Sequence, residues 1–468
     1  MRAAAPWQEA WTGGRRAVQI GNVADFNAQF LPGVRTMRRT ALPQPPEARR
    51  QGHHYSCLAA FYTPHPAVLV LPHQVDSSWI TTLERELEWD PVETHSGIAT
   101  HSTVAEALAA RPALRERIAG AGLPVKAWGR TDGPGEILRA VHRFESKAES
   151  HALFERIGAG HPGVRIPAQQ QADSPRRLAR VLADRAARGE TTVLKAHHGV
   201  GGFGTAVLTP DEVAAAGGAG ALLRQLTAEQ VMPAGAGLLI EEYIDGQGRL
   251  RNLTFDAVIA DDGTVHPVGV AVMHVEGTSY QGATVGPGTV PDPLAATAAR
   301  FGCEVGQALA DAGYRGWYDI DFVTDRAGRL APTETNLRLT GPAVAFMLQA
   351  RLDAVRGGPG HLVRTLDHLP LGARLPQQTL LEHLQRTAGR CAALGVTLLP
   401  TIPTASFDPR PSVGIALCAR TADVPESTRA LTAAEALTAA EALVRAANLA
   451  LGDAFDGLGA PAEPVSPP

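Results

Sequence analysis

The sequence lacks several features that would place the protein in a special class. Its four cysteines, Cys57, Cys303, Cys391 and Cys418, lie far apart and form no C-x-x-C pair. A disulfide framework and a thiolate zinc site are therefore not indicated. The longest apolar runs, such as residues 67–71, are far too short to span a bilayer, and the N-terminal segment lacks the apolar core of a signal peptide.

A strong excess of charge is also missing. The 468 residues carry 43 lysines and arginines against 47 acids, which gives a formal net charge of −4. This balance supplies no basic field for a nucleic-acid backbone or an anionic membrane surface. We expect a cytoplasmic protein with a length sufficient for several domains, whose partners are small molecules or other subunits, without nucleic acid or membrane.

Apolar runs, helix signals and turn residues divide the chain into five parts. Residues 1–15 are predicted to be loose, and strands near 16–22 and 67–71 with a helix at 103–119 indicate a small α/β domain over 16–140. Further strands and helices follow in 141–345, including a helix at 147–156 and strands at 191–196, 205–208, 238–243, 253–260, 265–275 and 318–324. The Gly-, Thr- and Pro-rich segment between 275 and 292 is predicted to be a long loop. Residues 346–452 are predicted to form an α/β extension, with one alanine-rich helix around the repeated LTAAEA hexamer, and 453–468 are predicted to be a disordered tail.

One glycine-rich segment, residues 199–204, fits the spacing G-x-G-x-x-G. A dinucleotide fold needs a helix directly after these glycines, and a P-loop needs Lys and then Ser or Thr. Here Thr205-Ala206-Val207-Leu208 follows, which is typical of a strand. The segment is therefore predicted to be a flexible hairpin whose backbone N–H groups can cover phosphates, beside Lys195 on the preceding strand. An ordinary glycine-rich hairpin with a surface lysine is the alternative.

A second pattern lies in residues 316–336, which are predicted to form strand, turn and strand. Such a hairpin can bring Asp321, Glu334 and Asn336 together, and the last two share one face of their strand. Three oxygen ligands on one surface suit Mg²⁺. An exposed hairpin with solvated acids is the alternative.

The order of these patterns resembles the ATP-grasp superfamily. The lysine strand with its glycine flap, the stretch Ile240-Glu241-Glu242-Tyr243-Ile244 and the hairpin ending in Glu334-Thr335-Asn336 carry the resemblance, which covers residues 145–345. It implies an α+β fold in which two α+β lobes clasp ATP, preceded by a small α/β pre-ATP-grasp domain.

Two shorter stretches are similar to a narrower group. Val18-Gln19-Ile20-Gly21-Asn22 and the signature ETNLRLTG at 334–341 resemble the pheganomycin-type peptide ligases and the related propargylglycine-glutamate ligase. Leu339 and Pro342 depart from the pattern of that group, which bears on the substrate more than on the chemistry of ATP.

The resemblance implies a role for each matched residue. Lys147 and Lys195 would contact the phosphates of ATP under a flap that contains Gly199, Gly201, Gly202, Phe203 and Gly204. Glu241, Tyr243 and Ile244 would form the hinge at the adenine, and Asp245 would contact the ribose. One or two Mg²⁺ ions would be held by Asp321, Glu334 and Asn336. Arg338, on the same strand face, would hold the substrate carboxylate and stabilise the acylphosphate. Arg338 and Lys195 are the predicted catalytic residues.

The function implied is an ATP-dependent carboxylate-amine ligase that joins amino acids through an acylphosphate and releases ADP and phosphate. An ATP-grasp phosphotransferase and a non-catalytic nucleotide-binding module are the alternatives. A homodimer is expected, because ATP-grasp ligases often form one. For single residues the open alternatives are a solvated Lys147, an ion pair of Arg338 with a nearby acid, and strand-end charges at Glu241 and Asp245. The pairs His53-His54 and His197-His198 are not predicted to bind zinc, since adjacent strand residues point to opposite faces.

Overall fold

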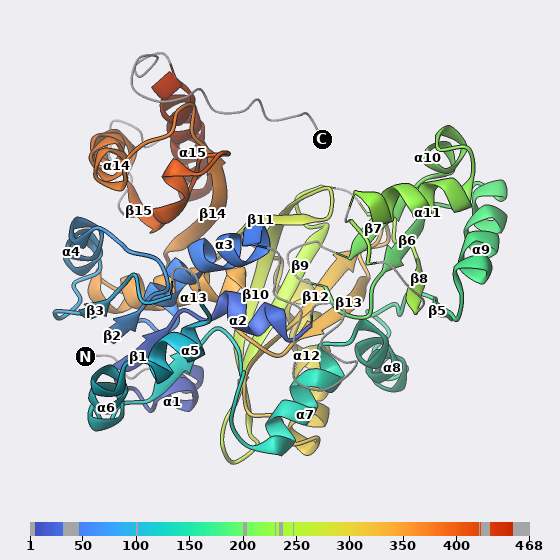
Figure 1. Cartoon of the computed structure of the whole chain (residues 1–468), viewed down its shortest axis with the longest axis horizontal. Helices are drawn as coiled ribbons and strands as arrows, with labels where there is room; N and C mark the ends of the chain where they lie inside the picture. Colours follow the sequence, from blue (N-terminus) through green and yellow to red (C-terminus); the bar gives the residue numbers. More distant parts are fainter. Residues whose placement is uncertain are drawn as a thin grey trace.

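The computed structural model describes residues 5–30, 46–99, 102–199, 204–229, 231–233, 237–246, 248–420, 422 and 431–452. In these residues the chain forms two four-stranded sheets and one eight-stranded sheet, with helices on their faces (Figure 1). The predicted α+β class, two lobes preceded by a smaller α/β domain, is confirmed.

A four-stranded parallel sheet organises the N-terminal part of the chain. Its order is β3-β2-β1-β4, with β1 at Ala17–Ile20, β2 at Pro66–Val70, β3 at Glu93–His95 and β4 at Val125–Ala127. The intervening helices are α2 (Val23–Ala28), α3 (Pro46–Tyr55), η1 (Ser56–Phe61), α4 (Ser77–Glu86), α5 (Val104–Ala109) and α6 (Pro112–Gly120). Parallel strands need crossover connections, so the alternation of strands and helices in the sequence correctly indicates this arrangement.

The start of the chain differs from the prediction of a loose segment over residues 1–15. Pro6–Thr12 forms helix α1, and its residues Trp7 and Trp11 are buried. Both rings pack edge-on against Trp317, with ring centroids 5.8 Å apart in each pair. The prediction is wrong here because the partner of these aromatic rings lies far along the chain, where the local sequence gives no sign of it.

A second four-stranded sheet, which we call the small lobe, is antiparallel throughout. Its order is β5-β8-β6-β7, with β5 at Gln169–Ala172, β6 at Thr192–Lys195, β7 at Thr205–Leu208 and β8 at Leu238–Glu242. The helices α9 (Pro175–Ala187), α10 (Pro210–Ala215) and α11 (Ala219–Ala228) lie against it, and Figure 1 shows this lobe at one side of the molecule. Leu178, Leu194 and Ile240 belong to a hydrophobic core separate from the main one.

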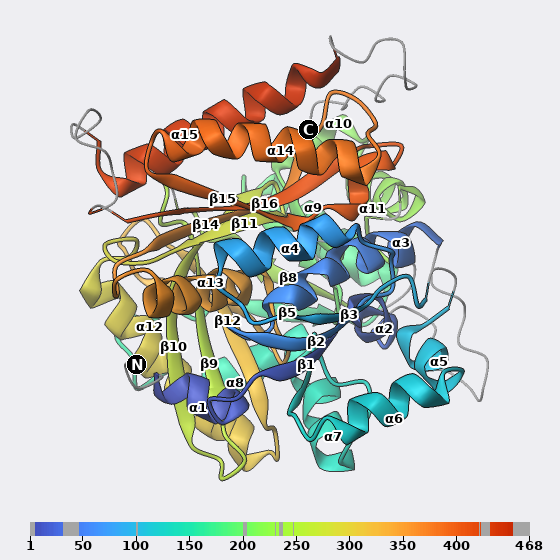
Figure 2. The same ribbon diagram turned by 90° about the vertical axis from the view of Figure 1, so that its left-hand side faces the viewer.

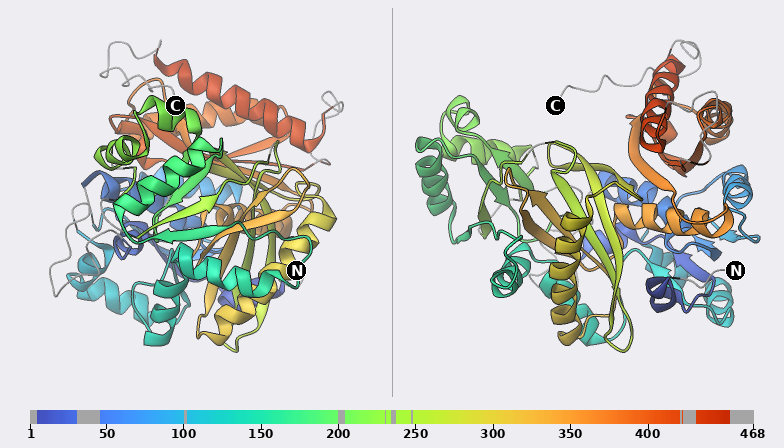
Figure 3. Two further views of the ribbon diagram at one scale, coloured as in Figure 1. Left: turned by 90° about the vertical axis from the view of Figure 1, so that its right-hand side faces the viewer. Right: turned by 180° about the vertical axis from the view of Figure 1, so that it is seen from behind.

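The eight-stranded antiparallel sheet has the order β13-β12-β9-β10-β11-β14-β16-β15. Its first five strands are β9 (Asn252–Ile259), β10 (Val265–Glu276), β11 (Ser279–Val285), β12 (Gly316–Thr324) and β13 (Leu330–Asn336). The helices of this part are α7 (Gly135–Phe144), α8 (Lys147–Gly158), α12 (Asp292–Asp311) and α13 (Gly341–Val355). Helix α12 lies along the sheet against β9 and β10, as the view from behind shows (Figure 3).

The C-terminal part extends this same sheet. It contributes β14 (Leu362–Pro370), β15 (Val396–Ile402) and β16 (Ser412–Ala419), with η2 (Thr404–Phe407) between the last two. Helices α14 (Gln377–Ala392) and α15 (Ala433–Leu449) cover it, side by side in Figure 2. The repeated hexamer lies in α15, one helix as predicted.

Two local predictions are wrong, and one lies outside the described residues. The segment between 275 and 292 is not one long loop, because β11 follows β10 after a short turn and pairs with it. The helix predicted over 103–119 is two helices, because Pro112 lacks the N–H that a continuous helix requires. The predicted tail at 453–468 is not described. No helix in the described ranges combines the length and apolarity needed to cross a membrane.

Candidate active site

Acidic and amide side chains lie in rows across three adjacent strands of the large sheet. In the register of β12 and β13, Asp321 stands opposite Glu334 and Asp319 opposite Asn336. On the other side of β12, Asp319 stands opposite Asp256 of β9. Because side chains alternate along a strand, these residues share one face. The structure thus brings together Asp321, Glu334 and Asn336, as the sequence predicts.

Crowding of these carboxyl groups shifts their pKa values. Burial raises the pKa of Asp321 well above its ordinary value, and the negative charges of Asp319 and Glu334 raise it further. The pKa of Asp319 rises to about 7, mainly through burial. For Glu334, burial favours a higher pKa, but the ammonium groups of Lys147 and Lys195 outweigh it and lower the pKa below its ordinary range. The raised pKa values of Asp319 and Asp321 thus reflect burial and mutual repulsion, which a cation bound beside them would offset.

Two lysines from different elements reach the same strand, β13. Lys147 is buried at the start of α8 and forms an ion pair and hydrogen bond with the Glu334 carboxylate. Lys195, at the end of β6 in the small lobe, donates to the carbonyl oxygen of Thr333 over 3.2 Å. Lys195 and Glu334 therefore face one site and not two separate ones.

Local contacts fix the position of Lys147. Its backbone N–H donates to the carbonyl oxygen of His197, just beyond β6, over 2.8 Å. One turn along α8, the Ser150 hydroxyl lies 3.0 Å from that of Thr335 on β13, which in turn donates to the Phe144 carbonyl oxygen over 2.6 Å. The first turn of α8 is thereby tied to the small lobe and to the large sheet, so Lys147 is not a solvated helix lysine.

Arg338 follows β13 and is buried among aromatic and acidic groups. Its Nη2 donates to the Oδ1 of Asn336 over 2.7 Å, and its guanidinium carbon lies 5.8 Å from the ring centroid of Trp128. Its Nε lies 3.8 Å from a carboxylate oxygen of Glu145, without a hydrogen bond. The alternative of an ion pair with a nearby acid is thus met in part, and one N–H of the guanidinium has no partner.

The predicted hinge residues have partners within the protein. The Glu241 carboxylate is buried, with one oxygen 2.6 Å from Lys195 Nζ and the other accepting from Gln169 over 2.7 Å. The Tyr243 hydroxyl accepts from Arg251 over 3.1 Å. Ile244 is buried, and Asp245 pairs with Arg326 at 2.5 Å on the surface. The carboxylates of Glu241 and Asp245 are therefore both engaged in ion pairs within the protein.

The glycine flap is described only at its ends. Lys195 of β6 pairs with Thr205 of β7, so the segment connects two antiparallel strands and not a strand and a helix, as predicted. Gly204 has a φ of 78°, a conformation that favours glycine, and its N–H donates to the Val231 carbonyl oxygen over 3.0 Å. Gly199 lies at the other end, whereas Gly201, Gly202 and Phe203 lie outside the described residues.

Sequence reasoning missed three buried acids of this site. Asp319 could have been found, since it is two residues before Asp321 on the same strand and must share its face. Asp256 is the one acid in β9, where it stands between Phe255 and Ala257, and an acid in such apolar surroundings signals a special environment. Glu145, which accepts from the Leu337 N–H over 2.6 Å, gave no local signal.

The donor atoms of this surface fit Mg²⁺. Asp321 and Glu334 supply carboxylate oxygens and Asn336 an amide oxygen, which are hard ligands, and the raised pKa of Asp321 shows the charge that a divalent cation would offset. Among the described residues no group of three or more His, Cys, Asp or Glu side chains is arranged to hold a metal ion. An ion at this surface would therefore depend on two carboxylates and one amide, with its remaining ligands from phosphate and water.

A cavity of about 650 Å³ lies elsewhere, between α4 and the C-terminal part, with Arg85, Arg356 and Leu384 in its lining. None of the predicted site residues lines it. His53 and His54 are buried on α3 beside His73, and His274 bonds to Thr284 (2.7 Å) in the large sheet, so these histidines have structural surroundings of their own.

No family model and no curated protein matches the sequence. Similar solved structures include the ADP complex of an N5-carboxyaminoimidazole ribonucleotide synthetase (12% identity, TM-score 0.47, 92% of this chain and 96% of that chain). They also include the same enzyme from Thermus thermophilus (17%, 0.44, 84% and 95%) and a biotin carboxylase from Campylobacter jejuni (14%, 0.47, 79% and 84%). At such identities and TM-scores these matches carry no conclusion about the reaction, which depends on the side chains described above.

Proposed function

We propose that this protein is an ATP-dependent carboxylate-amine ligase of the ATP-grasp type, which uses Mg²⁺ and forms an amide or peptide bond through an acylphosphate. One observation carries the proposal. Lys195 of the small lobe and Lys147 of α8 both reach the strand that bears Glu334, so two cations and the acidic surface face each other across the junction of the lobes. A nucleotide triphosphate needs cations on one side and metal ligands on the other.

The residues of this site would divide the work of phosphoryl transfer. Lys147 and Lys195 would bind the phosphates, and the flap from Gly199 to Gly204 would cover them with backbone N–H groups. Asp321, Glu334 and Asn336 would hold Mg²⁺, which neutralises phosphate charge when it is bound. The ion pair with Glu241 would hold Lys195 in place, because both groups are buried and satisfy each other.

Arg338 would bind the carboxylate substrate. Its guanidinium is buried, keeps an unpaired N–H and lies beside the strand that would hold the metal. A guanidinium in this position can bind the substrate carboxylate while a carboxylate oxygen attacks the γ-phosphorus of ATP. The same guanidinium can later stabilise the oxyanion that forms when the amine adds to the acylphosphate. The amine then displaces phosphate from the acylphosphate.

Amino acids are the substrates we propose, on the basis of the resemblance of residues 334–341 to the pheganomycin-type ligases. We also propose that the protein forms a homodimer, and light scattering of the purified protein measures its oligomeric state.

A panel of amino acids, singly and in pairs, tests this function through ADP formation and mass detection of products. ADP and phosphate released only when a carboxylate and an amine are both present support the ligase. A stable phosphorylated product identifies a phosphotransferase instead. Nucleotide binding without turnover of any pair identifies a non-catalytic module.

A further inference from the structure

A cluster of aromatic side chains encloses one carboxyl group where the N-terminal domain meets the large sheet. The Tyr55 hydroxyl, at the end of α3, donates to a carboxylate oxygen of Asp367 on β14 over 2.5 Å. The Tyr55 ring packs edge-on against Trp128 (ring centroids 5.5 Å apart) and stacks with His368 (6.1 Å). Tyr280 of β11 joins them, since its phenol lies in the electrostatic field of Asp367. We call these five residues the Asp367 cluster.

The Asp367 cluster adjoins the proposed reaction site. Trp128 contacts the guanidinium of Arg338 and its carbonyl oxygen accepts from the Leu339 N–H over 2.8 Å. The Tyr280 ring packs so closely on Gly341 that a Cβ there would lie 2.3 Å from it. The phenol of Tyr280 is also close enough to feel the charge of Asp321. The cluster therefore continues the acidic surface towards the N-terminal domain.

Two buried N–H groups between the two sites have no hydrogen-bond partner. They are the indole N–H of Trp128 and the Nε of Arg338. Buried polar atoms are nearly always paired in folded proteins, so two unpaired donors side by side indicate a surface that can bind a polar ligand.

Asp367 itself lacks a cation. No ion pair of Asp367 is found among the described residues, and burial raises its pKa to about 7. A carboxyl group held in this way among aromatic rings suits an ammonium group, which the carboxylate attracts by charge and the ring faces attract through their negative electrostatic potential.

We propose that the Asp367 cluster is the binding site of the amine substrate, with Asp367 and the hydroxyls of Tyr55 and Tyr280 receiving a primary ammonium group and the Asp367 carboxylate taking its proton. This proposal rests on the ligase function above. It names the chemical class of the second substrate, a primary amine that arrives as its ammonium form, and gives Asp367 the role of general base.

The step balances in atoms and charge. The ammonium gives one proton to the Asp367 carboxylate, and the lone pair of the resulting amine attacks the acyl carbon of the acylphosphate. The new C–N bond gives a tetrahedral oxyanion, which collapses as the C–O bond to phosphate breaks and the phosphate leaves with that electron pair. The second proton of the nitrogen goes to the departing phosphate, which yields the amide, HPO₄²⁻ and a protonated Asp367.

Two acceptor nucleophiles distinguish the role of the Asp367 cluster from the formation of the acylphosphate. Each standard amino acid is supplied with ATP and Mg²⁺ at pH 7.5 as the carboxylate. The acceptor is either hydroxylamine, which is uncharged and needs no base, or an amino acid amide, which can act only as an amine. Hydroxamate and amide products are measured by mass spectrometry on the full-length protein.

The variant Asp367→Asn should lower kcat/KM for amino acid amides by roughly 10²-fold or more and leave hydroxamate formation within about threefold of the wild type. Tyr55→Phe should raise KM for the amides and spare hydroxamate formation. The control Asp353→Asn removes a carboxylate that bonds to His361 over 2.7 Å outside this cluster, and it should change neither reaction.

Equal loss of both reactions in Asp367→Asn, or loss of neither, overturns the proposal. If Asp367→Asn does not fold, Tyr55→Phe and Asp367→Glu decide by the same comparison. A wild type that forms hydroxamates but accepts none of the amides overturns the proposal while the ligase function stands. A wild type that forms no hydroxamate with any carboxylate contradicts the ligase function itself.

Discussion

At position 334 one carboxylate must serve two kinds of partner. It bonds to Lys147, and it is one of three oxygen ligands that face the proposed metal. In Glu334→Gln the amide can still accept a hydrogen bond from Lys147, but it binds Mg²⁺ far more weakly. We expect kcat/KM for ADP formation to fall by roughly 10²-fold or more while the circular dichroism spectrum is unchanged.

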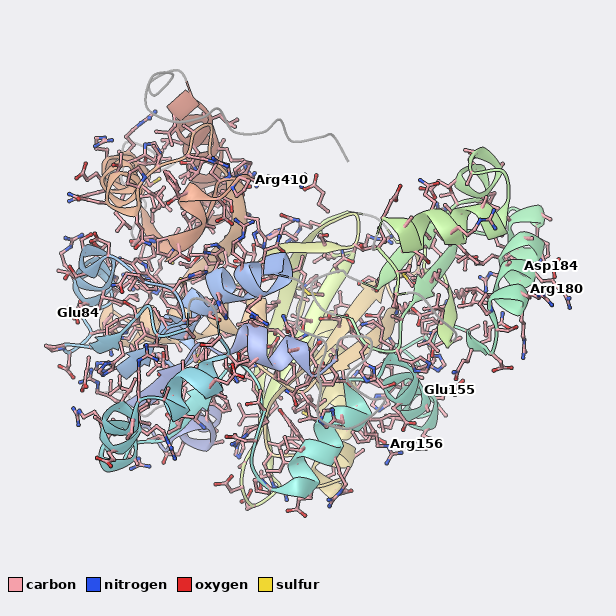
Figure 4. The ribbon with its side chains drawn as sticks, viewed as in Figure 1. Glu84, Glu155, Arg156, Arg180, Asp184 and Arg410 are labelled. Carbon is pink, nitrogen blue, oxygen red and sulfur yellow. The ribbon has the colours of Figure 1, made fainter. Side chains whose placement is uncertain are left out.

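A matched change elsewhere controls for the loss of a glutamate. Glu155 lies on the outer side of α8 and is exposed (Figure 4), so Glu155→Gln should leave ADP formation unchanged. Full activity of Glu334→Gln would contradict the assignment of Glu334 as a metal ligand, because replacing a carboxylate ligand of Mg²⁺ by an amide should lower activity.

The pair of Lys195 with Glu241 allows stability and activity to be separated. Both side chains are buried, so Lys195→Met leaves an uncompensated carboxylate and should cost about 3–5 kcal/mol in the free energy of unfolding. Adding Glu241→Gln removes that charge and should restore most of the stability but none of the activity. Urea unfolding and ADP assays on the single and double variants check this, and a double variant no more stable than Lys195→Met would contradict the pairing.

Asp367 should make stability depend on pH in a defined direction. Its pKa is raised from 3.8 to about 7, so the folded state binds a proton more tightly than the unfolded state. That contribution is complete below about pH 4 and is lost as pH rises towards 7, where the folded state must hold a buried charge. The Asp367→Asn variant should therefore gain stability relative to the wild type between pH 4 and 7 and show no further change above it. Urea unfolding across this range measures the difference, and a constant difference would contradict the raised pKa.

At the scale of elements, several strands were predicted well. Residues 205–208 match β7, and β9, β10 and β12 begin or end within two residues of their predicted bounds. These strands show their character locally, because they are rich in β-branched and aromatic residues. Their pairing into an eight-stranded sheet depends on contacts between distant segments, such as β11 with β14, and these leave no local pattern.

The same distinction applies to the site. Lys195, Asp321, Glu334 and Asn336 stand in short patterns with a chemical meaning, and the structure brings them together. Glu145 and Asp367 lie in unremarkable sequence, and only packing shows that each carboxyl group is enclosed. Residues whose environment comes from tertiary contacts could not be found from spacing.

The junction of β11 and β14 depends on a glycine. A Cβ on Gly282 would lie 2.0 Å from the carbonyl oxygen of Thr365, and its φ of 152° disfavours other residues. Gly282→Ala should therefore lower the free energy of unfolding by about 1–3 kcal/mol. Gly389, in α14, has open space around its Cα, so Gly389→Ala should stabilise by about 0.5–1 kcal/mol. Urea unfolding compares the two, and equal effects would show that the close approach does not matter.

At the scale of the whole molecule, the small lobe should be the part that responds to nucleotide. Its core, which includes Leu194 and Ile240, is separate from the main core, and part of its attachment to the large sheet consists of the polar contacts of Lys195 and Arg165, the latter with Glu242 and Asp325. A unit with its own small core opens at lower free energy than the sheet that carries β9 and β12. Amide hydrogen exchange should therefore be faster in β6 and β8 than in β9 and β12.

A non-hydrolysable ATP analogue with Mg²⁺ binds only the assembled site, so it should slow exchange in β6 and β8 far more than in β9 and β12, by mass action on the open state. Glu334→Gln should weaken this protection without changing exchange in the absence of nucleotide, because the metal ligand is lost while the lobe contacts remain. Protection that appears equally in both parts, or that is unchanged in Glu334→Gln, would place the nucleotide outside the junction of the lobes.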